Sequence, residues 1–200
     1  RMLLNQVGRV KAVLVLDKEG NALIAKYYNL PELSDKNKRA FETRLHKASK
    51  ASKSSTFENS FFTLEGQIAF FRIYDDISIF VIGNEDDSEL VISEVLDTLH
   101  ECFDEAFSHV IDRESLINNM TAVILIIDEL IDGGIIMATE SATILDRINV
   151  KLSDSKKAGK DKKSTKEDEK QPEPAPSSGY YSFTSVFSNA KSSFAKTLGL

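Results

Sequence analysis

The strongest constraint in this sequence comes from apolar runs that are joined by very short connections. Residues 13–16, 68–71 and 77–82 are almost unbroken stretches of apolar side chains, a pattern typical of strands buried on both faces. Such strands are usually parallel, but a parallel connection needs a dozen or more residues. Here Glu65-Gly66 and Asp75-Asp76 are the whole links on either side of one strand. The strands must therefore form antiparallel hairpins, and their sheet needs cover on both faces from helices or from another protein.

Helical periodicity predicts elements that can supply this cover. We expect helices over residues 35–51, 88–110 and 112–131, and a short closing helix over residues 139–148. The third helix is expected to bury a stripe of apolar residues, namely Leu116, Met120, Val123, Ile124, Ile127, Leu130 and Ile131. Gly133 and Gly134 should end that helix and lead into a brief extended piece. With the strands, the predicted order is ββαβββαα.

The first predicted helix has a strongly basic side. Phe41 and Leu45 lie on the side expected to cover the sheet, whereas most of its lysine and arginine residues fall on the other side, namely Lys36, Lys38, Arg39, Lys47 and Lys50. Two interpretations are open. The basic side is either a solvated helix face or a surface that meets an acidic partner or an anionic membrane.

The composition divides the chain into three parts. Residues 1–152 have enough apolar side chains for one folded domain. Residues 153–178 are rich in lysine, glutamate, serine and proline, and we expect them to be a disordered linker. Residues 179–200 predict an amphipathic C-terminal helix that docks through Phe183, Val186, Phe187, Phe194 and Leu198. Docking on protein is preferred to insertion into membrane, because Lys191 and Lys196 are the only basic residues of this tail.

The chain carries no pattern that predicts catalysis, a cofactor or a metal. The formal net charge of −6 argues against nucleic acid as the main partner. Cys102 is the only cysteine, so a disulfide within the chain and a cysteine-rich zinc site are excluded, and a reducing cytosolic setting fits best. His100 and His109 lie on opposite sides of the second helix and cannot share a metal. No apolar stretch is long enough to span a membrane, and no signal peptide is expected.

One group of carboxylates deserves comparison with a catalytic site. Asp128, Glu129 and Asp132 lie together at the end of the third predicted helix, where negative charge is mildly unfavourable. A catalytic pair needs a partner base or a cleft residue, and neither accompanies them. A solvated turn, or a contact to a basic partner, is the favoured interpretation.

Several segments resemble a known family. Residues 11–17, 25–28, 64–66, 80–83 and 128–136 are similar to the zeta-subunit family of coatomer, the COPI vesicle coat, which is related to the sigma small subunits of clathrin adaptors. The resemblance covers roughly residues 10–150 and returns at residues 186–191. It implies a longin-like α+β fold, in which a five-stranded antiparallel sheet carries one helix on one face and two on the other. The predicted element order agrees with that fold.

The resemblance also implies a function without catalysis. Zeta subunits are structural: they bind the trunk of the gamma large subunit in the adaptor-like part of the coat, which Arf-family GTPases recruit to the cytoplasmic face of Golgi membranes for retrograde and intra-Golgi transport. A sigma-type clathrin adaptor subunit that helps to bind sorting signals is the close alternative. The longin fold also occurs in SNAREs and GTPase regulators, but residues 153–178 lack the heptad-rich helix of a SNARE. An enzyme of unknown type is the remaining alternative.

The residues that contact a partner can be named only as a hypothesis. Tyr27 and Tyr28 end the first hairpin, and Phe41 and Leu45 lie on the first helix near the basic surface. Because these are large side chains beside charged ones, we expect partner-contacting residues among them.

Overall fold

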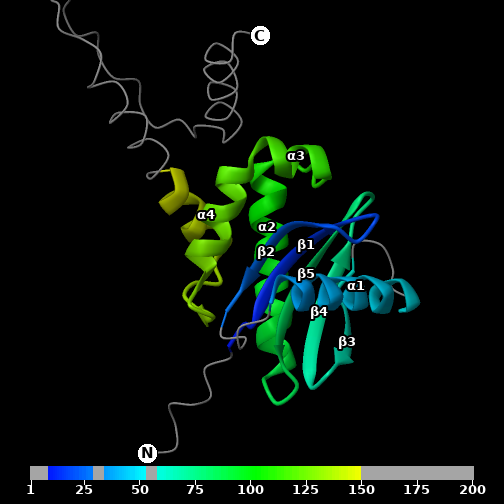
Figure 1. The fold of residues 1–200 in the computed structure, drawn as a ribbon. Helices are drawn as coiled ribbons and strands as arrows, with labels where there is room; N and C mark the ends of the chain where they lie inside the picture. The colour runs from blue at the N-terminus through cyan, green and yellow to red at the C-terminus, as the bar shows by residue number, and fades with distance from the viewer. Residues whose placement is uncertain (1–8, 29–33, 53–57, 150–200) are drawn as a thin grey trace, which may run out of the picture.

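The computed structural model describes residues 9–28, 34–52 and 58–149. Its centre is a five-stranded sheet in the order β2-β1-β5-β4-β3, in which every neighbouring pair is antiparallel (Figure 1). The strands are β1 (Ala12–Asp17), β2 (Ala22–Tyr27), β3 (Ser60–Leu64), β4 (Gln67–Ile73) and β5 (Ile77–Asn84). The predicted antiparallel hairpins and the α+β fold are therefore confirmed.

The two-residue link between β3 and β4 shows why the short connections force hairpins. Glu65 and Gly66 both have positive φ angles, of 55° and 72°. Two such residues in succession match the twist of antiparallel strands, and glycine accepts this conformation without a steric penalty. The strands on either side pair from Ser60 with Phe71 to Leu64 with Gln67.

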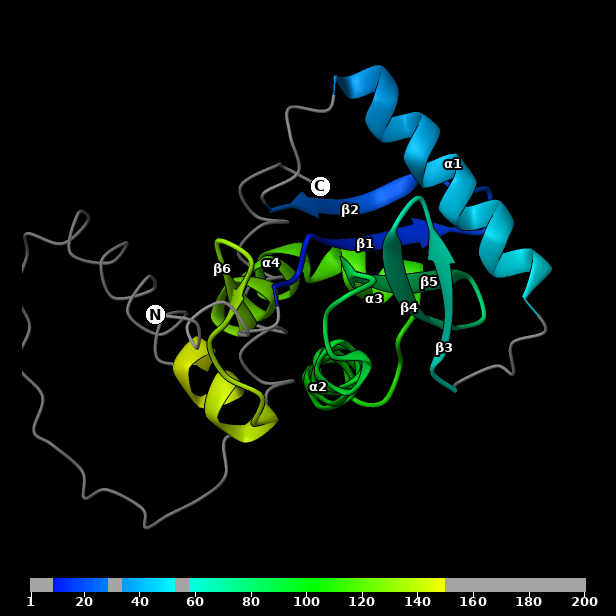
Figure 2. The same ribbon diagram turned by 90° about the horizontal axis from the view of Figure 1, so that it is seen from below.

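One face of the sheet is covered by α1 (Asp35–Ala51). The helix begins where predicted, and the Ser34 hydroxyl accepts a hydrogen bond from the Asn37 amide at 3.4 Å. Phe41 and Leu45 pack with Leu14, Phe71 and Phe80 in a compact apolar cluster under this helix. Figure 2 shows α1 on one side of the sheet and α2 and α4 on the other.

The opposite face is covered by α2 (Glu89–Ala106), α4 (Met120–Leu130) and a final helical segment at residues 141–149. These elements form the larger of the two cores, to which α2 contributes Leu99 and Phe103 and α4 contributes Val123 and Ile127. The final segment buries Ile144, Leu145 and Ile148, as predicted. Both faces of the sheet are thus covered mainly by helices of the same chain.

The second helix ends earlier than the sequence predicts. It stops at Ala106 and not near Val110, because Ser108 and His109 adopt positive φ angles of 56° and 66°. The His109 amide donates to the Asp104 carbonyl at 2.7 Å, which closes the last turn as in a glycine-terminated helix although no glycine is present. Because no glycine stands at this helix end, the amino-acid pattern carries no stop signal there.

The third predicted helix is two helices. Asn119 has φ −118° and separates α3 (Arg113–Asn118) from α4, and its side-chain amide donates to the Ser115 carbonyl at 2.8 Å. The prediction that Ile124 packs inward is wrong, because this break changes the phase of the helix. The buried positions of α4 are Ala122, Val123, Ile126, Ile127 and Leu130.

The glycine turn after α4 is confirmed. Gly133 and Gly134 have positive φ angles of 55° and 88° and join the two-residue strands β6 (Ile131–Asp132) and β7 (Ile135–Ile136). No helix among the described residues is both long enough and apolar enough to cross a membrane. The proposed linker at 153–178 and the C-terminal helix at 179–200 lie outside the described residues, so the division into domains stays a prediction.

Candidate partner-binding surface

The side chains that most often perform catalysis are dispersed in this fold. Cys102 is fully buried in α2, and burial raises the pKa of its thiol to about 12, which suits a small apolar core residue and not a nucleophile. His100 bonds to the Tyr74 hydroxyl at 3.0 Å, whereas His109 is exposed and bonds to Asp104 at 2.6 Å. Within the described ranges, no group of three or more histidine, cysteine or acidic residues is arranged to hold a metal ion.

The carboxylates at the end of α4 are held by basic side chains of the same chain. Asp128 forms an ion pair with Lys26 of β2, and Glu129 forms a longer one with Arg147, at 3.8 Å. These pairs connect α4 to the edge strand and to the final helical segment. Asp128 and Glu129 thus contact basic residues of this chain, whereas the sequence favoured a solvated turn or a contact to a basic partner.

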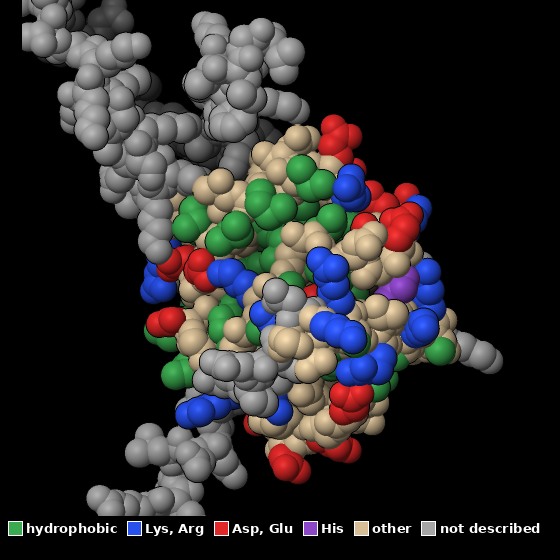
Figure 3. Space-filling model, viewed as in Figure 1, with side chains coloured by type: hydrophobic (Ala, Val, Ile, Leu, Met, Phe, Trp, Pro, Cys, Tyr) green, Lys and Arg blue, Asp and Glu red, His purple; other side chains and the backbone are tan. Residues whose placement is uncertain are grey.

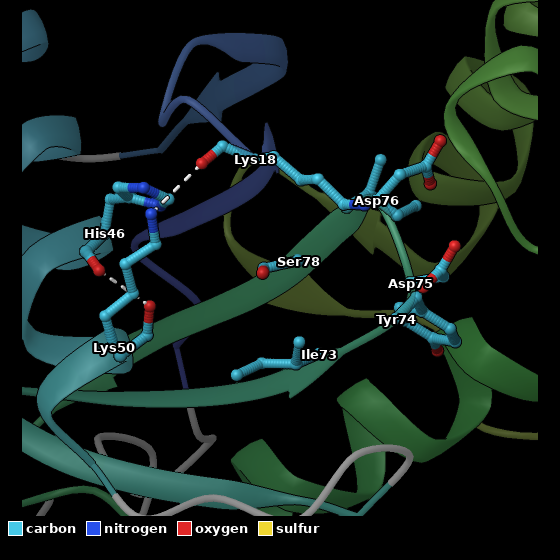
Figure 4. A pocket seen from close by; sticks show the side chains of 10 residues that line it. Lys18, His46, Lys50, Ile73, Tyr74, Asp75, Asp76 and Ser78 are labelled. Atoms are coloured by element: carbon cyan, nitrogen blue, oxygen red, sulfur yellow. Dashed lines mark hydrogen bonds between the residues drawn. The ribbon is translucent and has the colours of Figure 1, made fainter.

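A small pocket of about 280 Å³ lies between the end of α1 and the β4–β5 turn. Figure 4 shows His46 and Lys50 of α1 on one side and Asp75 and Asp76 on the other. Burial, more than the charge of Lys50, lowers the pKa of His46, so its ring is neutral at physiological pH. Lys50 donates to the Lys18 carbonyl at 3.2 Å, and Asp76 accepts from the Arg113 amide at 3.0 Å. The lining is mixed in charge: Lys50 and Asp76 are engaged in local structure, whereas Nδ1 of His46 is buried without a hydrogen-bond partner among the described residues.

The structure separates the four residues predicted to contact a partner into two kinds. Phe41 and Leu45 are 5% and 0% exposed and form the core under α1, so their side chains are not available at the surface. Tyr27 is half-buried and donates from its hydroxyl to Glu42 at 2.9 Å, with Lys38 over its ring. Tyr28 packs at the margin of the larger core. Partner contact stays a prediction, and only the two tyrosines have surface with which to make it.

Tyr28 has the more suggestive environment of the two. Its hydroxyl oxygen is buried and has no hydrogen-bond partner among the residues that the structure describes. Burial, together with the negative charges of Asp128 and Asp132, raises its pKa to about 12, so it stays protonated and able to donate. The unsatisfied hydroxyl lies where β2 meets the end of α4.

A strip of apolar side chains is exposed along α3 and α4. Ile117 and Ile124 are 42% and 38% exposed, and Met120 between them is partly exposed. Figure 3 shows apolar side chains gathered over these helices. We call Ile117, Met120 and Ile124 the α4 strip. The Lys26–Asp128 ion pair ties the same helix to β2, the edge strand of the sheet.

The predicted docking residues of the tail lie outside the described residues. These are Phe183, Val186, Phe187, Phe194 and Leu198. The α4 strip was missed for a different reason: its isoleucines follow the same helical spacing as core residues. Asn119 stands between the two helices that carry the strip, and the predicted single helix took no account of a break there.

Comparisons with known proteins place the described domain among coat subunits. Residues 9–155 match the family described as clathrin adaptor complex small chain. Coatomer subunit zeta-1 of Oryza sativa subsp. japonica is 32% identical over 143 residues, which cover 70% of this chain and 78% of the rice protein. Human coatomer subunit zeta-1 is 29% identical over 145 residues, 72% of this chain and 79% of its own length.

Similarity extends to fungi and to the level of structure. Coatomer subunit zeta of Saccharomyces cerevisiae is 29% identical over 150 residues, 70% of this chain and 77% of the yeast protein. A chain in a homology model of the full-length AP-3 complex in a stretched open conformation superposes with a TM-score of 0.58 at 19% identity. The match covers 76% of this chain and 98% of that one, and it confirms the adaptor small-subunit fold.

Proposed function

This chain belongs to the clathrin adaptor complex small chain family and, within it, to the coatomer zeta subunits, and on that premise we propose that it is a small structural subunit of the COPI vesicle coat. The observation that carries the proposal is similarity to zeta subunits across nearly the whole folded domain. The dispersed histidines and the buried Cys102 agree with a role in association and not in turnover. Its proposed place is the cytoplasmic face of Golgi membranes, in retrograde and intra-Golgi transport.

The direct partner that we propose is the trunk of a gamma-type coatomer large subunit. The α4 strip offers this partner an exposed apolar surface on two successive helices, and β2 is an edge strand of the sheet that the described residues form. Exposed apolar patches with a polar rim are characteristic of protein interfaces. Lys26 and Asp128 supply the rim here. Arf-family GTPases would then be reached through the complex.

Co-expression tests the assignment. The full chain is produced with the trunk of a coatomer gamma subunit or, in parallel, with the large chain of a clathrin adaptor, and each mixture is separated by size exclusion. We expect a stoichiometric complex with the gamma trunk only. A complex with the clathrin adaptor chain alone would instead favour a sigma-type subunit, and failure to bind either chain would contradict a role as an adaptor small subunit.

A further inference from the structure

Charge is divided between the two faces of the sheet. The sequence of α1 has six lysine and arginine residues against two acidic ones, a formal charge of +4. The sequence of α2 has six acidic residues and no lysine or arginine, a formal charge of −6. Figure 2 shows these helices on opposite sides of the sheet. The domain is therefore an electrostatic dipole that runs through the sheet, although its net charge is negative.

The basic residues of α1 form a straight stripe opposite its buried side. Lys36, Arg39, Lys47 and Lys50 are separated by intervals that return to one side of a helix, with Thr43 between them. All five residues are exposed. The stripe extends for roughly 20 Å along the helix axis. In Figure 3, lysine and arginine side chains gather over α1 on the face turned to the viewer.

Contacts within the domain keep negative and apolar groups away from this stripe. Glu42 is 9% exposed and accepts the Tyr27 hydroxyl, so its charge is turned toward the sheet. Phe41 and Leu45 are buried in the core below. Lys36, Arg39 and Lys47 form no ion pair with any residue in the described ranges. The outer side of α1 thus presents positive charge without an apolar anchor.

The chemistry of this stripe selects one kind of partner. Interfaces between proteins are depleted of lysine and depend on buried aromatic, methionine or arginine anchors, whereas the stripe has three lysines, one arginine and no aromatic or methionine side chain. A lipid surface rich in anionic headgroups needs no such anchor, because each lysine or arginine held near it raises partition by about fivefold. A straight row of long basic side chains on one helix can reach a flat surface together.

We propose that the outer side of α1 rests on an anionic lipid surface, with Lys36, Arg39, Lys47 and Lys50 contacting the headgroups. The acidic α2 on the far side of the sheet is repelled by the same surface, so the dipole fixes one orientation. The α4 strip belongs to α3 and α4 and shares no residue with this stripe. The inference depends on the charges of this chain and not on the identity of its protein partner.

Vesicle flotation of the full-length chain tests the proposal without any coat partner. Vesicles of phosphatidylcholine with about 30% phosphatidylserine serve as the probe, and pure phosphatidylcholine is the neutral control. We expect binding to the anionic vesicles at about 50 mM salt that weakens strongly toward 200 mM, because exposed charges are screened. Absence of binding to anionic vesicles at low salt would overturn the proposal, as would equal binding to neutral vesicles.

Charge-reversal variants locate the contact. Lys36→Glu/Lys47→Glu should lower partition more than tenfold, and Lys47→Glu should have a clearly larger effect than the matched change Arg147→Glu in the final helical segment. Glu101→Lys, which adds positive charge on α2, should change partition little if α1 faces the lipid. Equal effects of Lys47→Glu and Arg147→Glu would show that net charge alone governs binding. If the double variant still binds, the lipid contact lies elsewhere in the chain. Each of these two results would overturn the proposal.

A competition experiment distinguishes a lipid surface from an acidic protein as the partner of α1. Soluble poly-glutamate is added to the chain at the same concentration of negative charge as the vesicles carry. We expect vesicle binding to persist, because many headgroups on one surface act together. Two results together would contradict the lipid assignment: poly-glutamate displaces the chain from vesicles, and Lys36→Glu/Lys47→Glu no longer binds poly-glutamate directly. They would identify an acidic polypeptide as the partner. Thermal unfolding by circular dichroism confirms that each variant is folded.

Discussion

The least expected residue of this domain is Arg72, a cation at 7% exposure in a strand that is otherwise apolar. Its guanidinium donates to Asp97 of α2 at 2.7 Å and to Asn59 at 2.9 Å, and Asn59 donates in turn to Asp97 at 2.8 Å. Three charged or polar groups thus satisfy one another between sheet and helix. A buried charge without such partners would cost several kcal/mol. The network therefore allows the Arg72 guanidinium to be buried in this strand.

Substitution of Asp97 should show how much the buried Arg72 depends on its hydrogen-bond partners. We expect Asp97→Ala to lower the free energy of unfolding by about 2 kcal/mol, because Arg72 loses a charged hydrogen-bond partner while Asn59 remains. Urea unfolding followed by circular dichroism measures the change. Glu101→Ala, on the exposed side of the same helix, is the matched control and should change stability by less than about 0.5 kcal/mol. Equal effects of the two substitutions would remove Arg72 as a stabilising element.

Asp17 gives the hairpin between β1 and β2 a dependence on pH. Burial alone would raise its pKa, but hydrogen bonds from the Asn21 side chain and from the Asn21 and Glu19 amides lower it below the ordinary value of 3.8. A carboxyl whose pKa is lower in the folded state stabilises the fold above its unfolded pKa. This contribution is lost as the pH falls through the folded value.

Substitution of Asp17 should remove its contribution to the free energy of unfolding and the pH dependence of that contribution. Asp17→Ala is expected to cost about 1–2 kcal/mol at neutral pH, because the backbone amides of Glu19 and Asn21 lose their charged acceptor. The difference from the unmodified chain should narrow as the pH falls below 3.8. Asp17→Asn keeps an oxygen acceptor but no charge, so its cost should be smaller at neutral pH and independent of pH in this range. Chemical unfolding over a pH series decides, and a constant difference for Asp17→Ala would refute the assignment.

At the scale of elements, the closest approach between sheet and helix is at Gly83 of β5. A Cβ atom at this position would lie 2.8 Å from Cδ1 and 3.0 Å from Cγ1 of Ile92 in α2. The glycine therefore allows α2 to pack against the strand. Its role is spatial, since its φ angle is not in the left-handed region.

Substitution at this contact should show a specific coupling. Gly83→Ala is expected to destabilise the domain by about 1–3 kcal/mol through overpacking. Ile92→Val alone should cost about 1 kcal/mol, but it removes the Cδ1 atom that the new methyl group would meet. The double variant should thus be less destabilised than the two single costs added together. Strict additivity in thermal or urea unfolding would mean that the two residues do not limit the packing of α2.

Sequence patterns predicted some of these elements correctly and missed others, and the difference has physical reasons. Hairpins and amphipathic helices follow from link length and from periodicity, both of which are local properties. The break at Asn119 and the helix end at Ser108 depend on backbone conformations that neither residue announces. The position of Arg72 opposite Asp97 depends on the packing of distant segments. The amphipathic spacing of Phe41 and Leu45 serves the core under α1, which the sequence alone did not distinguish from a surface role.

At the scale of the whole molecule, the two covered faces leave different surfaces for different partners. The α4 strip is apolar and lies beside the free edge of β2, whereas the outer side of α1 is basic and without apolar anchors. Such a division suits a small subunit held between a larger protein and a lipid surface. The similarity to coatomer subunit zeta of human, rice and yeast supports membership of a vesicle coat.

Calorimetric titration of the purified full chain into the gamma trunk tests the proposal that the α4 strip binds this trunk. Ile117→Asp/Ile124→Asp should weaken binding at least a hundredfold, because two charges would be buried at the centre of the interface without partners. Leu90→Asp is the control: Leu90 is 82% exposed at the start of α2, and its substitution should leave the affinity unchanged. A folded double variant that binds as tightly as the unmodified chain would contradict this contact. Loss of binding in Leu90→Asp would also contradict it, because it would place the contact at the start of α2.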